Sequence, residues 1–132
     1  MSEGKFGTLY DQIGAEKINQ LVNAFYPRVY ADPDLSPLFE GDMSEIMRKQ
    51  RMFLTQFLGG PALYSDEFGP PAMRQRHLPF EITPKRAQCW LRCMGEAFAE
   101  IGLDKTPEGQ FFYSRLQQVA AIMINTPDSG EY

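Results

Sequence analysis

The chain has 132 residues and a mass of 15.1 kDa, it carries a net charge of −4, and 13% of its residues are aromatic. A chain of this length is expected to form one domain with a real core, because it removes roughly two thirds of its unfolded surface from water. The acidic balance gives no positive field for a polyanion, which argues against nucleic acid and anionic membranes as partners. The N-terminus has no apolar signal core and no run reaches transmembrane length, so we expect a cytoplasmic protein.

The first helix is predicted from apolar residues at helical spacing, which extend from about residue 14 to the Asp-Pro-Asp turn at 32–34. Pro27 interrupts this pattern and removes a backbone donor. The helix therefore either kinks at Pro27 or restarts just before Arg28, and the sequence leaves both alternatives open. The apolar positions are Ile18, Leu21, Val22, Phe25 and Val29.

The second helix is predicted to begin after Asp42, whose carboxylate can cap it, with Glu45 three positions later. It ends at the Gly-Gly-Pro sequence of residues 59–61. Its apolar stripe contains one amide, Gln50, and a buried amide must find partners. Gln50 therefore either faces a ligand, or lies at the edge of the stripe, or bonds a neighbouring backbone group. The stripe consists of Ile46, Gln50, Phe53, Leu54 and Phe57.

Three more segments follow from turn and cap signals. Residues 61–71 are rich in proline and are predicted to form a loop, and Pro71 suits the first turn of a short helix that runs to His77 and is ended by Pro79. The pair Thr83-Pro84 caps a longer helix that stops at Gly102, and Thr106-Pro107 repeats the start signal for the last helix. The two buried faces are predicted to comprise Ala87, Trp90, Leu91, Met94, Phe98 and Ile101 in the first of these helices, and Phe112, Leu116, Val119, Ala120 and Met123 in the second.

The predicted fold class is all-α, because no stretch shows convincing strand alternation. We expect a single domain over residues 1–132, with a core at about 8–125 and a disordered tail at 126–132. Cys89 and Cys93 lie one helical turn apart in the sequence CWLRC, on a predicted continuous helix, and this geometry is unsuited to a disulfide. Free thiols are typical of a reducing cytoplasm.

The chain contains a single histidine, His77, in the stretch RQRHLPFEITP at residues 74–84. One histidine cannot build a zinc site, because such sites recruit three or four ligands from the protein. It can be the one protein ligand of a cofactor that brings its own nitrogens. The alternative is a solvated side chain at the end of a helix.

Three strings of this sequence, FYPRVYADPDLSPLF at 25–39, KQRMFLTQFLGGPALYSD at 49–66 and RQRHLPFEITPKRAQCWLRCM at 74–94, resemble the group II truncated haemoglobins in order and spacing. The resemblance spans most of residues 8–125. It implies a truncated globin, a two-over-two helical sandwich around haem b, with His77 as the proximal iron ligand. A neutral imidazole is a suitable axial ligand for haem iron.

The resemblance also implies residues that contact the haem. Arg76 and Lys49 correspond to residues that bind the propionates, since a guanidinium matches a carboxylate with paired hydrogen bonds, and Tyr64 and Arg74 are further candidates. Taken alone, Arg74 and Arg76 are ordinary surface charges of a short helix. The expected apolar contacts of the haem are Phe39, Phe53, Leu54, Met73, Phe80 and Met94.

On the distal side the resemblance places Tyr26 and Trp90 over the iron, with Gln50 next to them. A phenol and an indole N–H can both donate to a ligand that carries partial negative charge. The alternative is that Trp90 is a core anchor and Tyr26 an amphipathic filler. Ile46 stands where many relatives have a small residue, which narrows the route to the iron. Both Ile46 and Pro27, which directly follows Tyr26, can shift the tyrosine.

Three classes of function are compatible with these residues. The first is reversible binding of dioxygen and other diatomic gases, the second is haem redox catalysis such as peroxide or nitric oxide turnover, and the third is a haem-free helical interaction module. The expected distal residues are donors that hold a ligand, and they include neither a histidine nor an arginine aligned to cleave peroxide. This favours gas binding, with a reductase that keeps the iron ferrous as a possible protein partner.

Overall fold

The computed structural model describes residues 8–39, 41–78 and 80–127, apart from the side chains of residues 73 and 74. These residues form helices and connecting turns and contain no strand, which confirms the all-α prediction. The main helices are α1 (Leu9–Ala31), α2 (Met43–Phe57), α3 (Leu63–Phe68), α4 (Met73–His77), α5 (Pro84–Ile101) and α6 (Pro107–Met123), and the 3-10 turns are η2 (Ser36–Leu38) and η3 (Leu103–Lys105).

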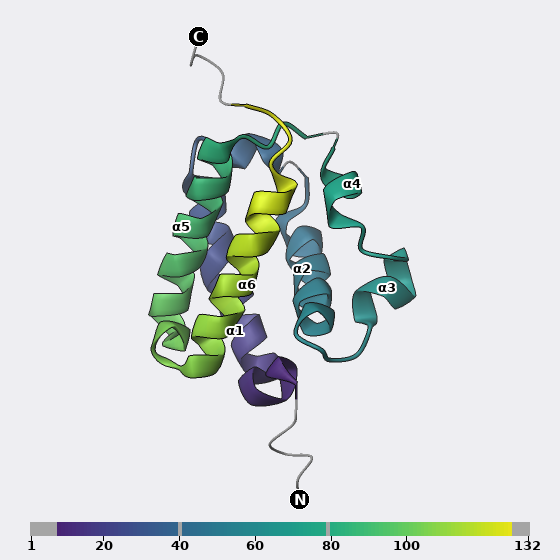
Figure 1. The fold of residues 1–132 in the computed structure, drawn as a ribbon, viewed down its shortest axis with the longest axis vertical. Coiled ribbons are helices and arrows are strands. Elements are labelled where there is room, and N and C mark those ends of the chain that lie inside the picture. Colours follow the sequence, from purple (N-terminus) through teal and green to yellow (C-terminus); the bar gives the residue numbers. More distant parts are fainter. Residues whose placement is uncertain (1–7, 40, 79, 128–132) are drawn as a thin grey trace, which may run out of the picture.

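The long helices form two antiparallel pairs (Figure 1). Helix α1 packs against α2 in one pair, α5 packs against α6 in the other, and the contact between α1 and α5 joins the pairs. The short helix α3 packs against α2 at one edge of the molecule, and α4, at the same edge, contacts α6. This is a two-over-two helical arrangement, and the core fills the space between the pairs.

Helix α1 begins earlier than its apolar pattern predicts. Thr8 and Asp11 form a capping box, in which each side chain accepts a hydrogen bond from the backbone N–H of the other residue, so the helix starts at Leu9. Gly14, with φ of 87°, then breaks the helical path. The apolar stripe was detected only from residue 14 because the short first turn has a different direction.

The backbone of α1 excludes a restart of the helix at Pro27. Gly14 is the only position inside this helix with non-helical dihedral angles, so the helix runs through Pro27 without a restart. The side chain of Arg28 donates to the carbonyl of Ala24 at 2.7 Å and pairs with Glu100 across the interface with α5. The guanidinium thus supplies an extra donor in the turn that the proline weakens.

The prediction that residues 61–71 form a loop is wrong, because α3 lies within them. The amide of Gln56 bonds both the backbone N–H and the hydroxyl of Ser65, and Arg48 of α2 pairs with Glu67 at 2.8 Å. These tertiary contacts stabilise a helix that local proline content argues against. The following helix α4 ends at His77 as predicted, but it begins at Met73, because Ala72 has a left-handed φ of 38°.

The Gly-Gly pair after α2 brings the start of α1 close to the end of α2. The backbone N–H of Tyr10 donates to Leu58 at 2.9 Å, and a Cβ atom added at Gly60 would lie 2.8 Å from the Tyr10 ring and 2.9 Å from a backbone oxygen of Thr55. A side chain at position 60 would therefore push the two helices apart. Asp42 caps α2 as predicted, whereas Glu45 pairs with Arg48 and does not complete a capping box.

Helices α5 and α6 have the predicted starts, since Thr83 and Thr106 accept hydrogen bonds from the backbone N–H groups of Arg86 and Gly109. Gly102 ends α5 with φ of 82°. The buried face of α5 is shifted around the helix from the predicted one. Trp90, Leu91 and Ile101 are only half-buried, and the buried residues are Ala87, Cys89, Cys93, Met94, Ala97 and Phe98. Cys89 and Cys93 are free thiols in this helix. Across the described residues, no helix is both long enough and apolar enough to cross a bilayer.

Candidate functional site

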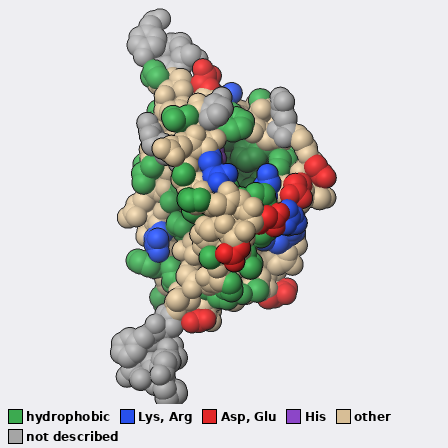
Figure 2. Space-filling view, turned by 90° about the vertical axis from the view of Figure 1, so that its right-hand side faces the viewer, with side chains coloured by type: hydrophobic (Ala, Val, Ile, Leu, Met, Phe, Trp, Pro, Cys, Tyr) green, Lys and Arg blue, Asp and Glu red, His purple; other side chains and the backbone are tan. Residues whose placement is uncertain are grey.

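A hollow lies between the helix pairs and opens beside α2 and α4. It has an outer chamber of about 490 Å³ and an inner chamber of about 130 Å³. Pockets for small ligands and cofactors typically have volumes of about 300–1,000 Å³. Figure 2 shows the hollow with a hydrophobic floor and basic side chains at its rim. The two chambers share the residues Tyr26, Leu38, Phe39, Gln50, Phe53, His77 and Ile82.

The outer chamber contains most of the residues that the sequence assigned to a cofactor. Apart from the shared residues, its wall consists of Pro37, Ile46, Lys49, Tyr64, Arg76 and Phe80. The inner chamber reaches between α5 and α6, and its further wall residues are Leu35, Arg86, Ala87, Trp90, Leu116, Val119, Ala120 and Met123. Predicted site residues from four helices, Tyr26 of α1, Gln50 of α2, His77 of α4 and Trp90 of α5, therefore line one hollow.

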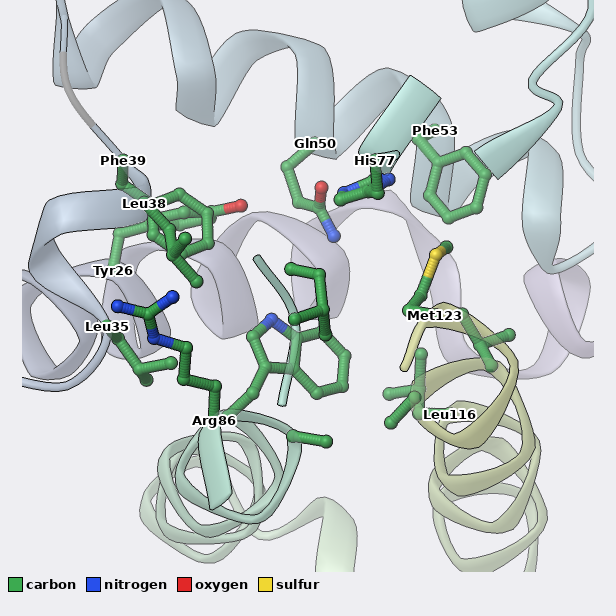
Figure 3. A pocket seen from close by; sticks show the side chains of 15 residues that line it. Tyr26, Leu35, Leu38, Phe39, Gln50, Phe53, His77, Arg86, Leu116 and Met123 are labelled. Carbon is green, nitrogen blue, oxygen red and sulfur yellow. The ribbon is translucent and has the colours of Figure 1, made fainter. Parts of the chain in front are cut away.

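His77 is the last residue of α4, and its side chain lines both chambers. Its ring lies 6.3 Å from the ring of Phe80, and its carbonyl accepts hydrogen bonds from the N–H of Phe80 at 2.9 Å and the amide of Asn125 at 3.2 Å. The backbone that carries the imidazole is thus tied to the segments on both sides. Figure 3 shows the imidazole at the edge of the hollow, which Gln50 also lines.

Three polar side chains reach the hollow from other walls. Tyr26 comes from α1, Gln50 from α2 and Trp90 from α5. The Tyr26 hydroxyl and the Gln50 amide point into the cavity in Figure 3. None of the three side chains has a hydrogen-bond partner in the described part of the chain. Tyr26 is buried and Gln50 and Trp90 are half-buried, so the three side chains present hydrogen-bonding groups to the hollow and to a molecule that binds there.

Tyr26 is held rigidly in an aromatic environment. It is only 2% exposed, and its ring lies 4.9 Å from Phe25 and 5.9 Å from Phe39 in edge-on contacts. Burial raises the pKa of Tyr26 well above its usual range, and the neighbouring Tyr30 adds to this effect. The phenol therefore remains a protonated donor at neutral pH.

The mouth of the hollow is cationic. The guanidinium of Arg76 lies 5.3 Å above the Tyr64 ring and donates to the carbonyls of Phe68 and Pro70 at 2.8 and 2.9 Å. The ammonium of Lys49 lies 5.0 Å from the Phe68 ring, and it has no carboxylate partner among the described residues. Two basic groups are thus available at the rim for an anionic substituent of a bound molecule.

Some predicted contacts lie elsewhere, and others were missed. Leu54 and Met94, each 1% exposed, are in the core and are not on the wall of either chamber. The side chains of Met73 and Arg74 lie outside the described residues. Arg86 was missed, although its place one helical turn before Trp90 puts it on the same face of α5. Val119, Ala120 and Met123 belong to the predicted stripe of α6, and the sequence indicated packing for them but gave no sign of a cavity.

A second group of potential ligands consists of Asp32, Asp34 and Cys89, whose ligand atoms all lie within 4.8 Å of one another. Asp32 forms an ion pair with Arg92, and Asp34 lies 3.7 Å from the ammonium of Lys85. These cations already balance the two carboxylates. The ion pairs with Arg92 and Lys85 therefore account for the two carboxylates, and we do not assign a metal site to this group.

Known proteins resemble this chain over almost its whole length. The model of the bacterial-like globin family matches residues 8–125. The group 2 truncated hemoglobin YjbI of Bacillus subtilis is 46% identical over 126 residues, which cover 96% of this chain and 95% of that protein. The crystal structure of the group II truncated hemoglobin from Bacillus anthracis has a TM-score of 0.90 at 48% identity, and covers 96% of this chain and 98% of that chain. The X-ray structure of a truncated oxygen-avid haemoglobin from Bacillus subtilis has a TM-score of 0.87 at 47% identity. The match covers 90% of this chain and 100% of that chain.

Proposed function

The chain belongs to the bacterial-like globins, among the truncated haemoglobins of group II, and from this premise we propose that it holds haem b through His77 and binds dioxygen reversibly. One observation carries the proposal. A single hollow contains the only imidazole of the chain and, on other walls, three polar side chains without a partner among the described residues. This combination suits a cofactor with one protein ligand and, beside it, a small molecule that carries partial charge once it is bound.

The residues of the hollow fit haem b. A porphyrin is flat and apolar and carries two carboxylates, and the outer chamber combines aromatic walls at Phe39 and Phe53 with basic groups at its mouth. We propose that Lys49 and Arg76 bind the carboxylates, with Tyr64 and Arg74 as further candidates. Arg76 already donates to two backbone carbonyls, so fewer of its N–H groups remain for hydrogen bonds to a carboxylate.

Haem would supply an iron atom that one imidazole could hold and that could bind a diatomic gas. His77 provides the imidazole in this proposal. Tyr26 and Trp90 donate hydrogen bonds toward the partial negative charge of the gas ligand, and Gln50 adds an amide beside them. Ile46 lines the outer chamber and narrows the approach from α2.

Reversible binding is favoured over redox turnover by the chemistry of the donors. The only arginine on the described wall of the inner chamber, Arg86, already donates to the carbonyls of Asp34 at 3.1 Å and Glu81 at 2.6 Å. Its guanidinium is therefore engaged in hydrogen bonds to two loops.

The solved neighbour from Bacillus subtilis is described as oxygen-avid, which supports a site that releases dioxygen slowly here. A haem-free interaction module finds no support in the family. We propose, as a protein partner, a reductase that returns oxidised iron to the ferrous state.

The proposed function is tested by reconstituting the purified protein with haem and recording absorption spectra of the ferric, ferrous, oxygenated and carbonyl forms. We expect one haem per chain, a ferrous form with a single protein imidazole, and an oxygenated form that returns to the ferrous form when the gas is removed. Absence of a Soret band after haem is supplied would overturn the cofactor assignment. Oxidation of the iron at every exposure to dioxygen would overturn reversible binding.

A further inference from the structure

The residues that follow α6 lie beside the segment that joins α4 to α5, at the end of the molecule where the C-terminus leaves (Figure 1). We call residues 77, 78 and 80–82 the histidine segment. Asn125 bonds this segment with both ends of its side-chain amide. Its Oδ1 accepts the N–H of Ile82 at 3.0 Å, and its Nδ2 donates to the carbonyls of Phe80 at 2.9 Å and His77 at 3.2 Å. One side chain thus contacts the start, the middle and the end of the histidine segment.

The backbone and a neighbouring hydroxyl reinforce this arrangement. The N–H groups of Asn125 and Thr126 both donate to the carbonyl of Ile82, at 3.0 and 3.1 Å, and the Thr126 hydroxyl donates to Asn125 Oδ1 at 2.7 Å. Two donors therefore converge on the amide oxygen and two carbonyls on the amide nitrogen. Only one orientation of the amide satisfies all four groups, so the side chain is fixed.

The histidine segment depends on such external contacts. Helix α4 has five residues, which is too short for a helix that is stable alone. In the described ranges, α6 is the only helix whose backbone lies close to that of α4. On the opposite side, Arg76 bonds the carbonyls of Phe68 and Pro70. From the side of α6, the side-chain amide of Asn125 donates a hydrogen bond to the His77 carbonyl itself.

We propose that Asn125 is a positioning residue for His77, and the proposal rests on the proposed function in which His77 holds the haem. The imidazole is attached to a backbone unit whose carbonyl Asn125 holds. Without the amide, His77, Phe80 and Ile82 each lose a hydrogen bond to the residues that follow α6, and the backbone of His77 can shift. The imidazole then takes a different orientation, which weakens or strains its bond to the iron and speeds haem loss.

A general staple between the C-terminus and the rest of the fold would also account for these hydrogen bonds, so a matched control is needed. Gln56 supplies one, because its amide makes two hydrogen bonds to Ser65 and ties α2 to α3. Gln56 is not among the residues that line either chamber. Gln56→Ala removes an amide clamp of similar size that has no contact with the histidine segment.

The experiment compares holoproteins of wild type, Asn125→Ala, Asn125→Asp and Gln56→Ala. The measurements are the iron–imidazole stretching frequency of the ferrous, ligand-free form by resonance Raman, and the rate of haem transfer from the ferric form to an excess of a haem acceptor. We expect Asn125→Ala to shift or broaden the stretching band and to speed haem loss roughly ten-fold. Asn125→Asp keeps the acceptor for Ile82 but loses both donors, and it is expected to show the same direction of change. Gln56→Ala should retain the wild-type band and haem-loss rate even if its melting temperature falls.

Two other results would overturn the inference in distinguishable ways. If both Asn125 variants keep the wild-type band and lose haem no faster than Gln56→Ala, Asn125 is a structural staple and the proposed function is untouched. If wild type shows no iron–imidazole band, or if His77→Ala keeps that band, the proposed role of His77 is wrong and the inference is wrong with it. Should Asn125→Ala fail to fold, Asn125→Asp provides the same two readouts.

Discussion

The indole of Trp90 stands edge-on against the ring of Phe25, with the ring centroids 5.5 Å apart and the planes at 75°. Phe25 is 1% exposed in the core of α1, whereas the indole also borders the inner chamber. The tryptophan therefore packs against the core and borders the hollow, and its N–H has no hydrogen-bond partner among the described residues. Because an indole N–H can only donate, the packing of the ring sets the direction of this hydrogen bond.

This contact predicts that Trp90, more than Tyr26, governs how slowly dioxygen leaves. A hydrogen bond to a partly charged acceptor in a dry pocket is worth about 1.5–3 kcal/mol. Trp90→Phe should therefore speed dioxygen dissociation by roughly ten- to a hundred-fold, if the loss lies in the off-rate. Stopped-flow kinetics of gas dissociation measure this directly.

Carbon monoxide is the control for the Trp90 prediction, because it carries less charge on its outer atom when bound. We expect Trp90→Phe to change its dissociation far less than that of dioxygen. Equal effects on both gases would mean that the tryptophan acts by steric packing. Tyr26→Phe should have the smaller effect on dioxygen, since the phenolic hydroxyl rotates, and a larger effect would reverse the order of the two donors.

Gly60→Ala should destabilise the protein by about 1–3 kcal/mol, because a Cβ atom at this position meets the Tyr10 ring and a backbone oxygen. Gly95→Ala in α5 is the matched control. Its Cβ atom would lie 3.4 Å from the Tyr113 hydroxyl with nothing nearer, and alanine is favoured over glycine in a helix by about 1 kcal/mol. Urea unfolding of the two variants should give opposite signs, and equal destabilisation would contradict the account of the Gly-Gly pair.

Cys89 and Cys93 should react slowly with thiol reagents in the native protein and give two titratable thiols per chain after unfolding. Both side chains are buried, and burial raises the pKa of both thiols, so little reactive thiolate forms at neutral pH. Titration with and without denaturant measures this difference. A stable disulfide between them in protein purified without an oxidant would show that the geometry of α5 had been misjudged.

The buried phenol of Tyr26 predicts a loss of stability at alkaline pH. Its folded pKa is raised above the usual 10.0, first by burial and then by Tyr30. The unfolded chain therefore releases this proton at a lower pH than the folded chain does, so stability is lost as pH rises above about 10. Unfolding free energies between about pH 9 and pH 11 should fall more steeply for wild type than for Tyr26→Phe. Parallel curves would contradict the raised pKa.

The long helices were predictable because their end signals are local. The Thr83 hydroxyl caps a backbone N–H three residues away, and Gly102 provides the left-handed turn that ends α5. Helix α3 was not predictable in this way. Its stabilising partners Gln56 and Arg48 lie nine and 19 positions from the residues that they bond, Ser65 and Glu67, and only the folded chain brings them together.

For the site, the resemblance in motifs led to His77, Tyr26, Gln50 and Trp90, all of which line the hollow. Composition and periodicity alone left the histidine and the glutamine undecided. Arg86 was missed because its partner Asp34 is 52 residues away in the sequence. Asn125 was missed because it lies beyond the last apolar position of α6, where neither helical periodicity nor the matched motifs gave any signal.

The central claim is that His77 is the protein ligand of the haem, and His77→Ala tests it most directly. The measurement is the absorption spectrum of the ferrous ligand-free and carbonyl forms, for the variant alone and after addition of free imidazole. We predict that the variant loses haem or shows altered ferrous spectra, and that imidazole restores spectra close to those of wild type. A variant that retains haem with unchanged ferrous and carbonyl spectra in the absence of imidazole would contradict the claim.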